Sequence, residues 1–175
     1  RKLWGGMVNE TRNLIRSASV HLAGERELLI SLTALTASFP LATMHQLRGT
    51  KLPGMLEAQH PPLLVATQMT AVLKEGHRRG GLSDIQQLVD YMGACERIRK
   101  TPLPFAYVVH LRRALVLYCF SLPFALVDTF GWGTIFDTLV VAYIFFGIEE
   151  IGVEIEGPFG FDDNDLPLED ICETI

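Results

Sequence analysis

Two long apolar stretches in the second half of the chain constrain its fold more than any other feature. Residues 103–127 contain only one histidine and two adjacent arginines as strongly polar side chains, and residues 129–148 contain a single charged residue. A membrane-spanning helix needs roughly 20 mainly apolar residues. The glycines of Gly131-Trp132-Gly133 lie between the stretches and favour a turn. The pattern therefore predicts a helical hairpin that crosses a membrane twice.

The charges near the ends of these stretches fit such a hairpin. If the chain folds back at residue 131, Arg112 and Arg113 come level with Glu149 and Glu150. Both pairs are then about 18 residues from the tip, or roughly 27 Å at 1.5 Å per residue, and the hydrocarbon layer is about 30 Å thick. We therefore expect these four charges at the inner membrane boundary or at an interface, where the arginines can meet the glutamates. At mid-bilayer a charge would be costly.

The basic residues predict the orientation of the hairpin. Thirteen of the 15 precede residue 101, and none follows Arg113. Arg97, Arg99 and Lys100 come just before the first apolar stretch, and the tip has no basic residue. Because basic flanks stay in the cytoplasm, we expect a multi-pass protein of the inner (plasma) membrane with both ends of this chain cytoplasmic. A soluble all-helical protein with two buried helices is the alternative.

The first hundred residues show helical periodicity with surface charge. Apolar residues recur at three- and four-residue intervals in residues 10–20, 25–39 and 63–73. We expect residues 25–39 to form a buried helix, with Pro40 disturbing its end. Ser83 and Gln86 have the spacing of a capping box, which predicts a helix start there. The chain thus divides into a cytosolic helical region (1–101), a two-helix transmembrane hairpin (102–152) and an acidic cytosolic tail (153–175).

The sequence carries no signature of an enzyme. It has neither an HExxH nor a GxSxG motif, and its five histidines are scattered. A net charge of −5 argues against a nucleic-acid partner. Three cysteines without a CxxC pair argue against a disulfide framework. We therefore predict no catalytic residue, no metal and no cofactor.

Two acidic groups follow the second apolar stretch. Glu150 and Glu154 would share one helix face, where like charges repel and favour water, cations or arginines as neighbours. Asp162, Asp163 and Asp165 could offer oxygen ligands to Ca²⁺, but their spacing is not that of an EF-hand loop. The alternative for this cluster is an acidic turn that caps the next helix.

Four motifs together resemble the bacterial bestrophin family over essentially the whole chain. They are RKLWGG at 1–6, TPLPFAY at 101–107, GIEEIG at 147–152 and PFGFDDNDLPL at 158–168. The resemblance implies an all-α integral membrane fold with cytosolic helices and a homopentameric ion channel. In the family the first motif follows the second membrane helix. The first span and the pore-lining neck helix therefore have no counterpart here, as expected of a part of a longer protein or of a degenerate homologue.

The resemblance also assigns roles to particular residues. A hydrophobic side chain near the start of the helix before the third span narrows the cytosolic exit in the family, and Ile85 matches it, so we expect Ile85 to be a pore constriction. Asp162 and Asp165 match two carboxylates of the Ca²⁺ clasp of animal members. Phe161 and Gly157 depart from that clasp, and fewer ligands weaken a Ca²⁺ site. We therefore expect these aspartates to brace subunits structurally, without Ca²⁺ gating, although a cation-binding role stays open.

These features predict a subunit, or the C-terminal portion, of a bestrophin-like channel that passes small monovalent ions. Its expected partners are monovalent ions, membrane lipid and further copies of itself, and no nucleic acid. The charge balance leaves the choice between anions and cations open. The alternative function is that of a non-conducting, membrane-anchored interaction protein derived from a channel.

Overall fold

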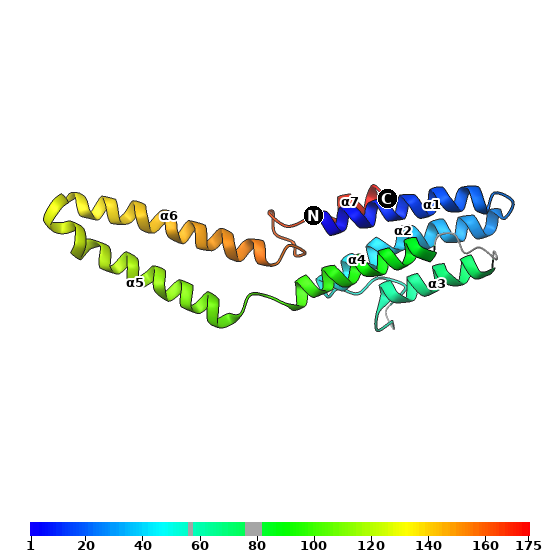
Figure 1. The fold of residues 1–175 in the computed structure, drawn as a ribbon, viewed down its shortest axis with the longest axis horizontal. Helices are drawn as coiled ribbons and strands as arrows, with labels where there is room; N and C mark the ends of the chain where they lie inside the picture. Colours follow the sequence, from blue (N-terminus) through cyan, green and yellow to red (C-terminus); the bar gives the residue numbers. More distant parts are fainter. Residues whose placement is uncertain (56–57, 76–81) are drawn as a thin grey trace. The chain divides into compact units, whose positions relative to one another are not determined.

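The computed structural model describes residues 1–55, 58–75 and 82–175, and within them the chain is all-α, as predicted. The helices are α1 (Lys2–His21), α2 (Arg26–Arg48), α3 (Pro61–Glu75), α4 (Leu82–Lys100), α5 (Phe105–Phe130), α6 (Gly133–Glu156) and α7 (Leu168–Glu173), as labelled in Figure 1. The chain divides into two compact units. We call them the bundle (Arg1–Lys100, Phe159–Phe161, Leu166–Ile175) and the hairpin unit (Thr101–Pro158, Asp162–Asp165).

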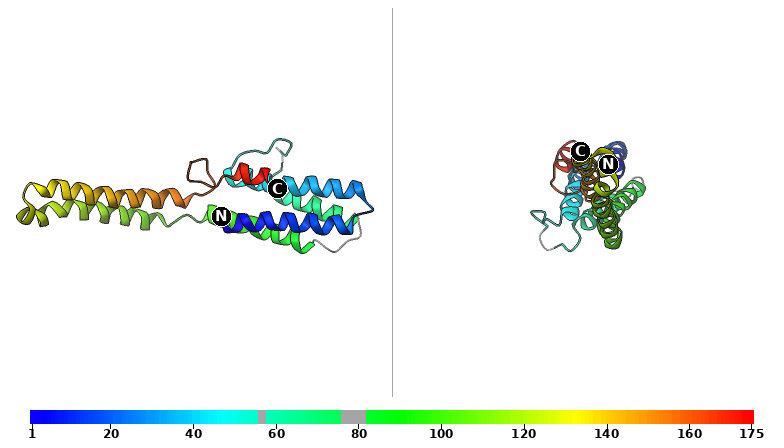
Figure 2. Two further views of the ribbon diagram at one scale, coloured as in Figure 1. Left: turned by 90° about the horizontal axis from the view of Figure 1, so that it is seen from above. Right: turned by 90° about the vertical axis from the view of Figure 1, so that its left-hand side faces the viewer.

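The bundle packs α1 against α4 and α2 against α3, with α7 lying on α2 (Figure 2). Its core is formed by the apolar faces that the periodicity indicates. Trp4, Met7 and Leu14 contribute from α1, and Leu32 and Phe39 from α2. Burying a side chain of this kind stabilises a fold by about 1.5–3 kcal/mol. The first half of the sequence can therefore form a packed body of its own.

Glycine allows α1 and α4 to approach closely at one position. A Cβ atom at Gly6 would lie 2.6 Å from Cζ of Tyr91. Real Cβ atoms do not approach other carbon atoms so closely, so the aromatic ring lies directly on the α1 backbone. A side chain at residue 6 would force the Tyr91 ring to move.

The prediction that Pro40 disturbs the end of its helix is wrong. Pro40 lies inside α2, which continues to Arg48. Proline in a helix interior removes a backbone hydrogen bond and costs about 3 kcal/mol. The residues that follow it, Ala42, Met44 and Leu47, are buried in the core. Their burial offsets that cost, so the helix extends through the proline.

The helix start predicted near Ser83 is confirmed, because α4 begins at Leu82. Ser83 lies inside the first turn rather than at the cap position. The Ser83 hydroxyl donates to the Asp84 carboxylate at 3.4 Å. A neighbouring carboxylate is a strong acceptor, so this side chain is not used as a cap.

The hairpin unit consists of α5 and α6, which lie side by side and reverse direction at Gly131 and Trp132. Gly131 has φ +54°, in the left-handed region that favours glycine. Both predicted spans are helices, but α6 is not among the described helices that are long and apolar enough to cross a membrane. α6 continues to Glu156, however, so the first four residues of the predicted tail belong to this helix.

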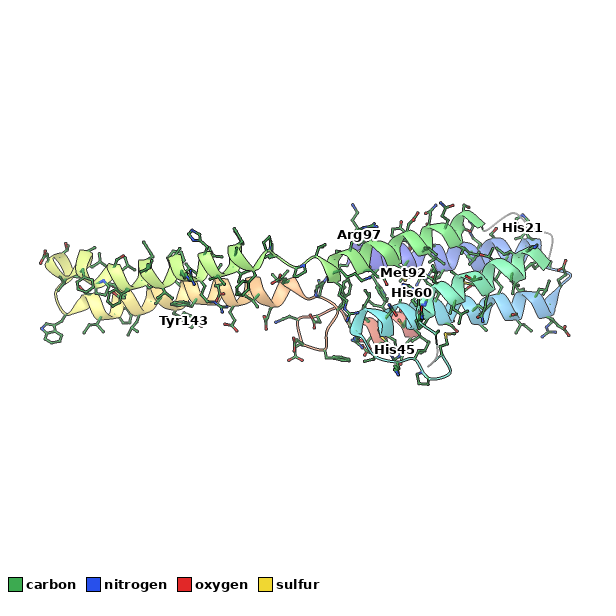
Figure 3. The ribbon with its side chains drawn as sticks, turned by 90° about the horizontal axis from the view of Figure 1, so that it is seen from below. His21, His45, His60, Met92, Arg97 and Tyr143 are labelled. Atoms are coloured by element: carbon green, nitrogen blue, oxygen red, sulfur yellow. The ribbon has the colours of Figure 1, made fainter. Side chains whose placement is uncertain are left out.

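Two of the described helices, α2 and α5, are long and apolar enough to cross a membrane. In the most apolar 18-residue window of each helix, 39% of the residues of α2 are buried, but only 6% of those of α5. α2 is therefore a core helix of the bundle, as predicted. α5 and α6 instead expose large aromatic side chains such as Phe120, Phe124 and Phe136; Tyr143, labelled in Figure 3, is another. A continuous apolar exterior of this kind is typical of contact with lipid or with other protein.

Candidate functional site

An ion pair joins the two hairpin helices at the level where the sequence predicts charges to meet. Arg112 on α5 donates to Oε1 of Glu149 on α6, from Nη2 at 2.6 Å and from Nε at 3.0 Å. The expected meeting of arginine and glutamate is confirmed for this pair. Arg113 and Glu150, in contrast, form no ion pair with any residue that the structure describes.

Two further contacts hold the last turns of α6. The backbone N–H of Leu103 donates to Glu156 at 2.6 Å, which ties the start of the hairpin to its end. Asn164 donates from its side-chain amide to Glu154 at 3.0 Å. Both glutamates are acceptors for neutral donors of the same unit. The predicted face shared by Glu150 and Glu154 is present in α6, and one of its members has an amide rather than a cation as its neighbour.

The acidic cluster of the tail forms a hydrogen-bonded turn. Asp165 accepts from the backbone N–H of Asp162 at 3.0 Å, and the backbone N–H of Asp165 donates to the carbonyl of Asp162 at 2.9 Å. The expectation that this cluster caps the next helix is wrong. α7 begins at Leu168 after Pro167 and has no side-chain cap. The Asp165 carboxylate is already used by the turn, which is why it does not reach α7.

No group of three or more His, Cys, Asp or Glu side chains in the described segments is arranged to hold a metal ion. Figure 3 shows His21 and His45 in separate parts of the bundle. His60 lies 3.0 Å from the Glu96 carboxylate, and Lys100 lies 3.7 Å from its other oxygen. The histidine of this group therefore contributes to the link between the segment before α3 and α4.

Ile85 lies in the core of the bundle. Its side chain is 5% exposed and belongs to the same apolar cluster as Leu88 and Met92 of α4. A side chain that narrows an ion path has to face that path. The pore role of Ile85 therefore stays a prediction.

Sequence reasoning missed Arg48, the last residue of α2. Its guanidinium binds Glu169 through both Nη groups, with Nη2–Oε2 at 2.9 Å, and lies 4.2 Å from the ring centroid of Phe161. Its Nε donates to the carbonyl groups of Phe159 and Gly160. More than a hundred residues separate Arg48 from these partners, so no local pattern marks the contact.

The exposed apolar hairpin and the helical bundle define a helical membrane protein. The family model described as Bacterial/Fungal Bestrophin protein matches residues 1–175, so the chain belongs to the bestrophin family. A protein of Nostoc sp. named voltage-dependent anion channel-forming protein is 41% identical, over 100% of this chain and 66% of its own length. The protein of that name from Escherichia coli K12, YneE, is 33% identical over 100% of this chain and 64% of its own length.

Solved structures give the same assignment. A crystal structure of a bacterial bestrophin homologue from Klebsiella pneumoniae, carrying a point mutation, matches with a TM-score of 0.90 and 30% identity over 99% of this chain and 73% of that one. The chain spans just under two thirds of the length of the curated relatives. Membership of a family whose relatives are named as channel-forming proteins supports a membrane location and bears out the prediction that the chain is not an enzyme.

Proposed function

We propose that the chain is the hairpin-containing part of an anion channel that assembles as a homopentamer and passes small monovalent anions down their gradient. The observation that carries this proposal is the family match along all 175 residues, together with relatives named as anion channel-forming proteins. Anions are chosen because of the names of these relatives. The net charge of −5 does not argue against anions, because a total charge does not locate a ring of charge in a pore.

The hairpin supports the membrane part of the proposal. Large apolar side chains cover the outside of α5 and α6. Six of the eight charged residues of these helices lie in the half that is away from the tip, and only Asp128 and Asp137 lie near the tip. Lipid tails and neighbouring subunits offer the apolar surroundings that such side chains need. The Arg112–Glu149 ion pair lowers the free-energy cost of holding these two charges near the hydrocarbon layer, because each charge is paired with the opposite one.

The basic residues support the orientation. Arg99, in the last turn of α4, donates to the backbone carbonyl of Gln46, and Lys100 is exposed beside Glu96. This basic end of α4 precedes the hairpin by only a few residues. By the positive-inside rule it belongs on the cytoplasmic side of the plasma membrane. The hairpin tip at Trp132 then faces the opposite side.

The alternative is a non-conducting membrane protein that uses the bundle for interaction. Anion flux separates the two. The full-length protein that contains this chain is reconstituted in liposomes that are loaded with a chloride-quenched dye. Chloride flux across these liposomes should be at least about tenfold faster than across liposomes without protein. A matched protein-containing sample in gluconate, an anion too large for a narrow filter, serves as the control. Chloride flux no faster than in empty liposomes, with intact pentamers present, would favour the non-conducting alternative.

A further inference from the structure

The guanidinium group of Arg48 contacts the segment that follows α6 through its Nε group, both Nη groups and its flat face. The Nε group donates to the backbone carbonyls of Phe159 at 3.3 Å and Gly160 at 3.2 Å. The two Nη groups bind the two carboxylate oxygens of Glu169. The flat face of the group lies on the ring of Phe161. Although the side chain is long and charged, it is only 6% exposed.

These contacts require arginine rather than any cation. The guanidinium is planar and offers donors in a fixed fork, so it can serve carbonyls along one edge and a carboxylate along another, and it stacks on an aromatic ring. A lysine has one compact ammonium and cannot fill the three roles together. The position also suits a cation, because Arg48 ends α2, where the helix dipole is negative.

Apart from the Arg48 contacts, the anchored segment is held by apolar packing. Phe159, Leu166, Leu168 and Cys172 are buried, and Ile171 packs against the same core. The helices α1 to α4 bury their own larger set of side chains against one another. Loss of the Arg48 contacts should therefore loosen Phe159–Phe161 and Leu166–Ile175 without unfolding the rest of the bundle.

We propose that Arg48 is a latch that docks Phe159–Phe161 and Leu166–Ile175 on the rest of the bundle. This segment begins three residues after the last residue of α6. The effect on conduction rests on the proposed channel function: when the segment is released from the bundle, fewer channels conduct.

Hydrogen–deuterium exchange of the full-length protein in detergent tests the docking. In Arg48→Lys and Arg48→Met, amides in residues 159–175 should exchange at least about tenfold faster, while amides of α1 and α3 keep their wild-type rates. Arg26→Lys and Arg26→Met, at the exposed opposite end of the same helix, are the matched controls and should change neither region. Unchanged exchange of residues 159–175 in Arg48→Met, or equal acceleration in α1 and α3, would overturn the latch.

Chloride flux into liposomes tests the consequence. Arg48→Lys should lower the flux per reconstituted pentamer by at least about twofold, and Arg26→Lys should leave it unchanged. Faster exchange in residues 159–175 together with wild-type flux would overturn the effect on conduction. If the wild-type protein itself carries no chloride, the proposed function fails, and the exchange experiment still decides the latch by itself.

Discussion

Arg112 and Glu149 lie 37 residues apart in sequence, and both Nε and Nη2 of the arginine donate to one carboxylate oxygen of the glutamate. The two side chains differ in burial: Glu149 is 9% exposed and Arg112 is 57% exposed. The carboxylate has therefore lost most of its contact with solvent, and the guanidinium has not. This asymmetry makes the arginine the more important member of the pair for stability.

Substitution of Arg112 should cost more than substitution of Glu149. Arg112→Met leaves a mostly buried carboxylate without its donor, and an unsatisfied buried polar group costs about 1–3 kcal/mol. Glu149→Gln keeps an acceptor for the arginine and should cost less than about 1 kcal/mol. Thermal unfolding of the detergent-solubilised protein measures both. Arg113→Met, which breaks no ion pair among the described residues, is the control, and equal losses for the Arg112 and Glu149 variants would contradict the asymmetry.

Two adjacent glycines of α1 should respond to alanine in opposite directions. Gly6→Ala places a Cβ atom 2.6 Å from the Tyr91 ring, so the ring must leave its packed position, at a cost of about 1–3 kcal/mol. Gly5→Ala meets no atom within 4 Å and should stabilise the helix by roughly 0.5–1 kcal/mol. Chemical denaturation of both variants gives the comparison. A Gly6→Ala protein as stable as wild type would show that the ring does not lie on the α1 backbone.

Ile85 can be tested for its two possible roles with a neighbour as reference. Ile85→Ala and Leu88→Ala both remove a buried side chain of α4 and should each cost about 2–5 kcal/mol. If Ile85 also narrows the ion path in the assembled channel, Ile85→Ala alone should raise single-channel conductance, because a wider passage lets ions keep more of their hydration. Conductance unchanged in both variants would assign Ile85 to the core only.

The Arg48–Glu169 pair should make stability depend on pH in the acid range. The Arg48 guanidinium beside Glu169 holds the pKa of that carboxyl below its ordinary value of 4.5. A carboxyl with a lowered pKa in the folded state stabilises above its unfolded pKa, and the contribution is lost as the pH falls through the folded pKa. Wild type should therefore be more stable than Glu169→Gln at pH 7, by at most about 1 kcal/mol because Glu169 is exposed.

The stability difference between wild type and Glu169→Gln should disappear at a pH well below 4.5. Unfolding in urea at several pH values measures this difference. Guanidinium chloride is unsuitable as the denaturant, because it is a salt and would screen the ion pair. Asp170→Asn, next to Glu169 on the same short helix, is the control. A difference that persisted at low pH would mean that the charge of Glu169 is not what Arg48 recognises.

The helical content of the chain could be predicted from its sequence because it depends on periodicity and on apolar length. The hairpin, the core role of residues 25–39 and the level of Arg112 with Glu149 all follow from counting residues along helices. The fate of Pro40 could not be predicted in this way. It depends on how much apolar surface the following residues bury, and that is a property of the packed bundle rather than of the helix itself.

The contacts of the tail show the same limit. The Asp162–Asp165 cluster is visible in the sequence, but whether its carboxylates cap a helix or close their own turn depends on the path of the backbone. Arg48 is separated from Glu169 by 121 residues and no motif links them. The predicted pore role of Ile85 rests on family resemblance, whereas the burial of its side chain in one chain reflects tertiary packing.

Recordings from planar bilayers with the purified full-length protein test the central claim most directly. With a tenfold gradient of potassium chloride, an anion channel gives a reversal potential close to the chloride equilibrium value, and replacement of potassium by a large cation leaves the current unchanged. The proposed function predicts that result. A reversal potential near the potassium value, or no current from protein shown to be pentameric, would contradict it.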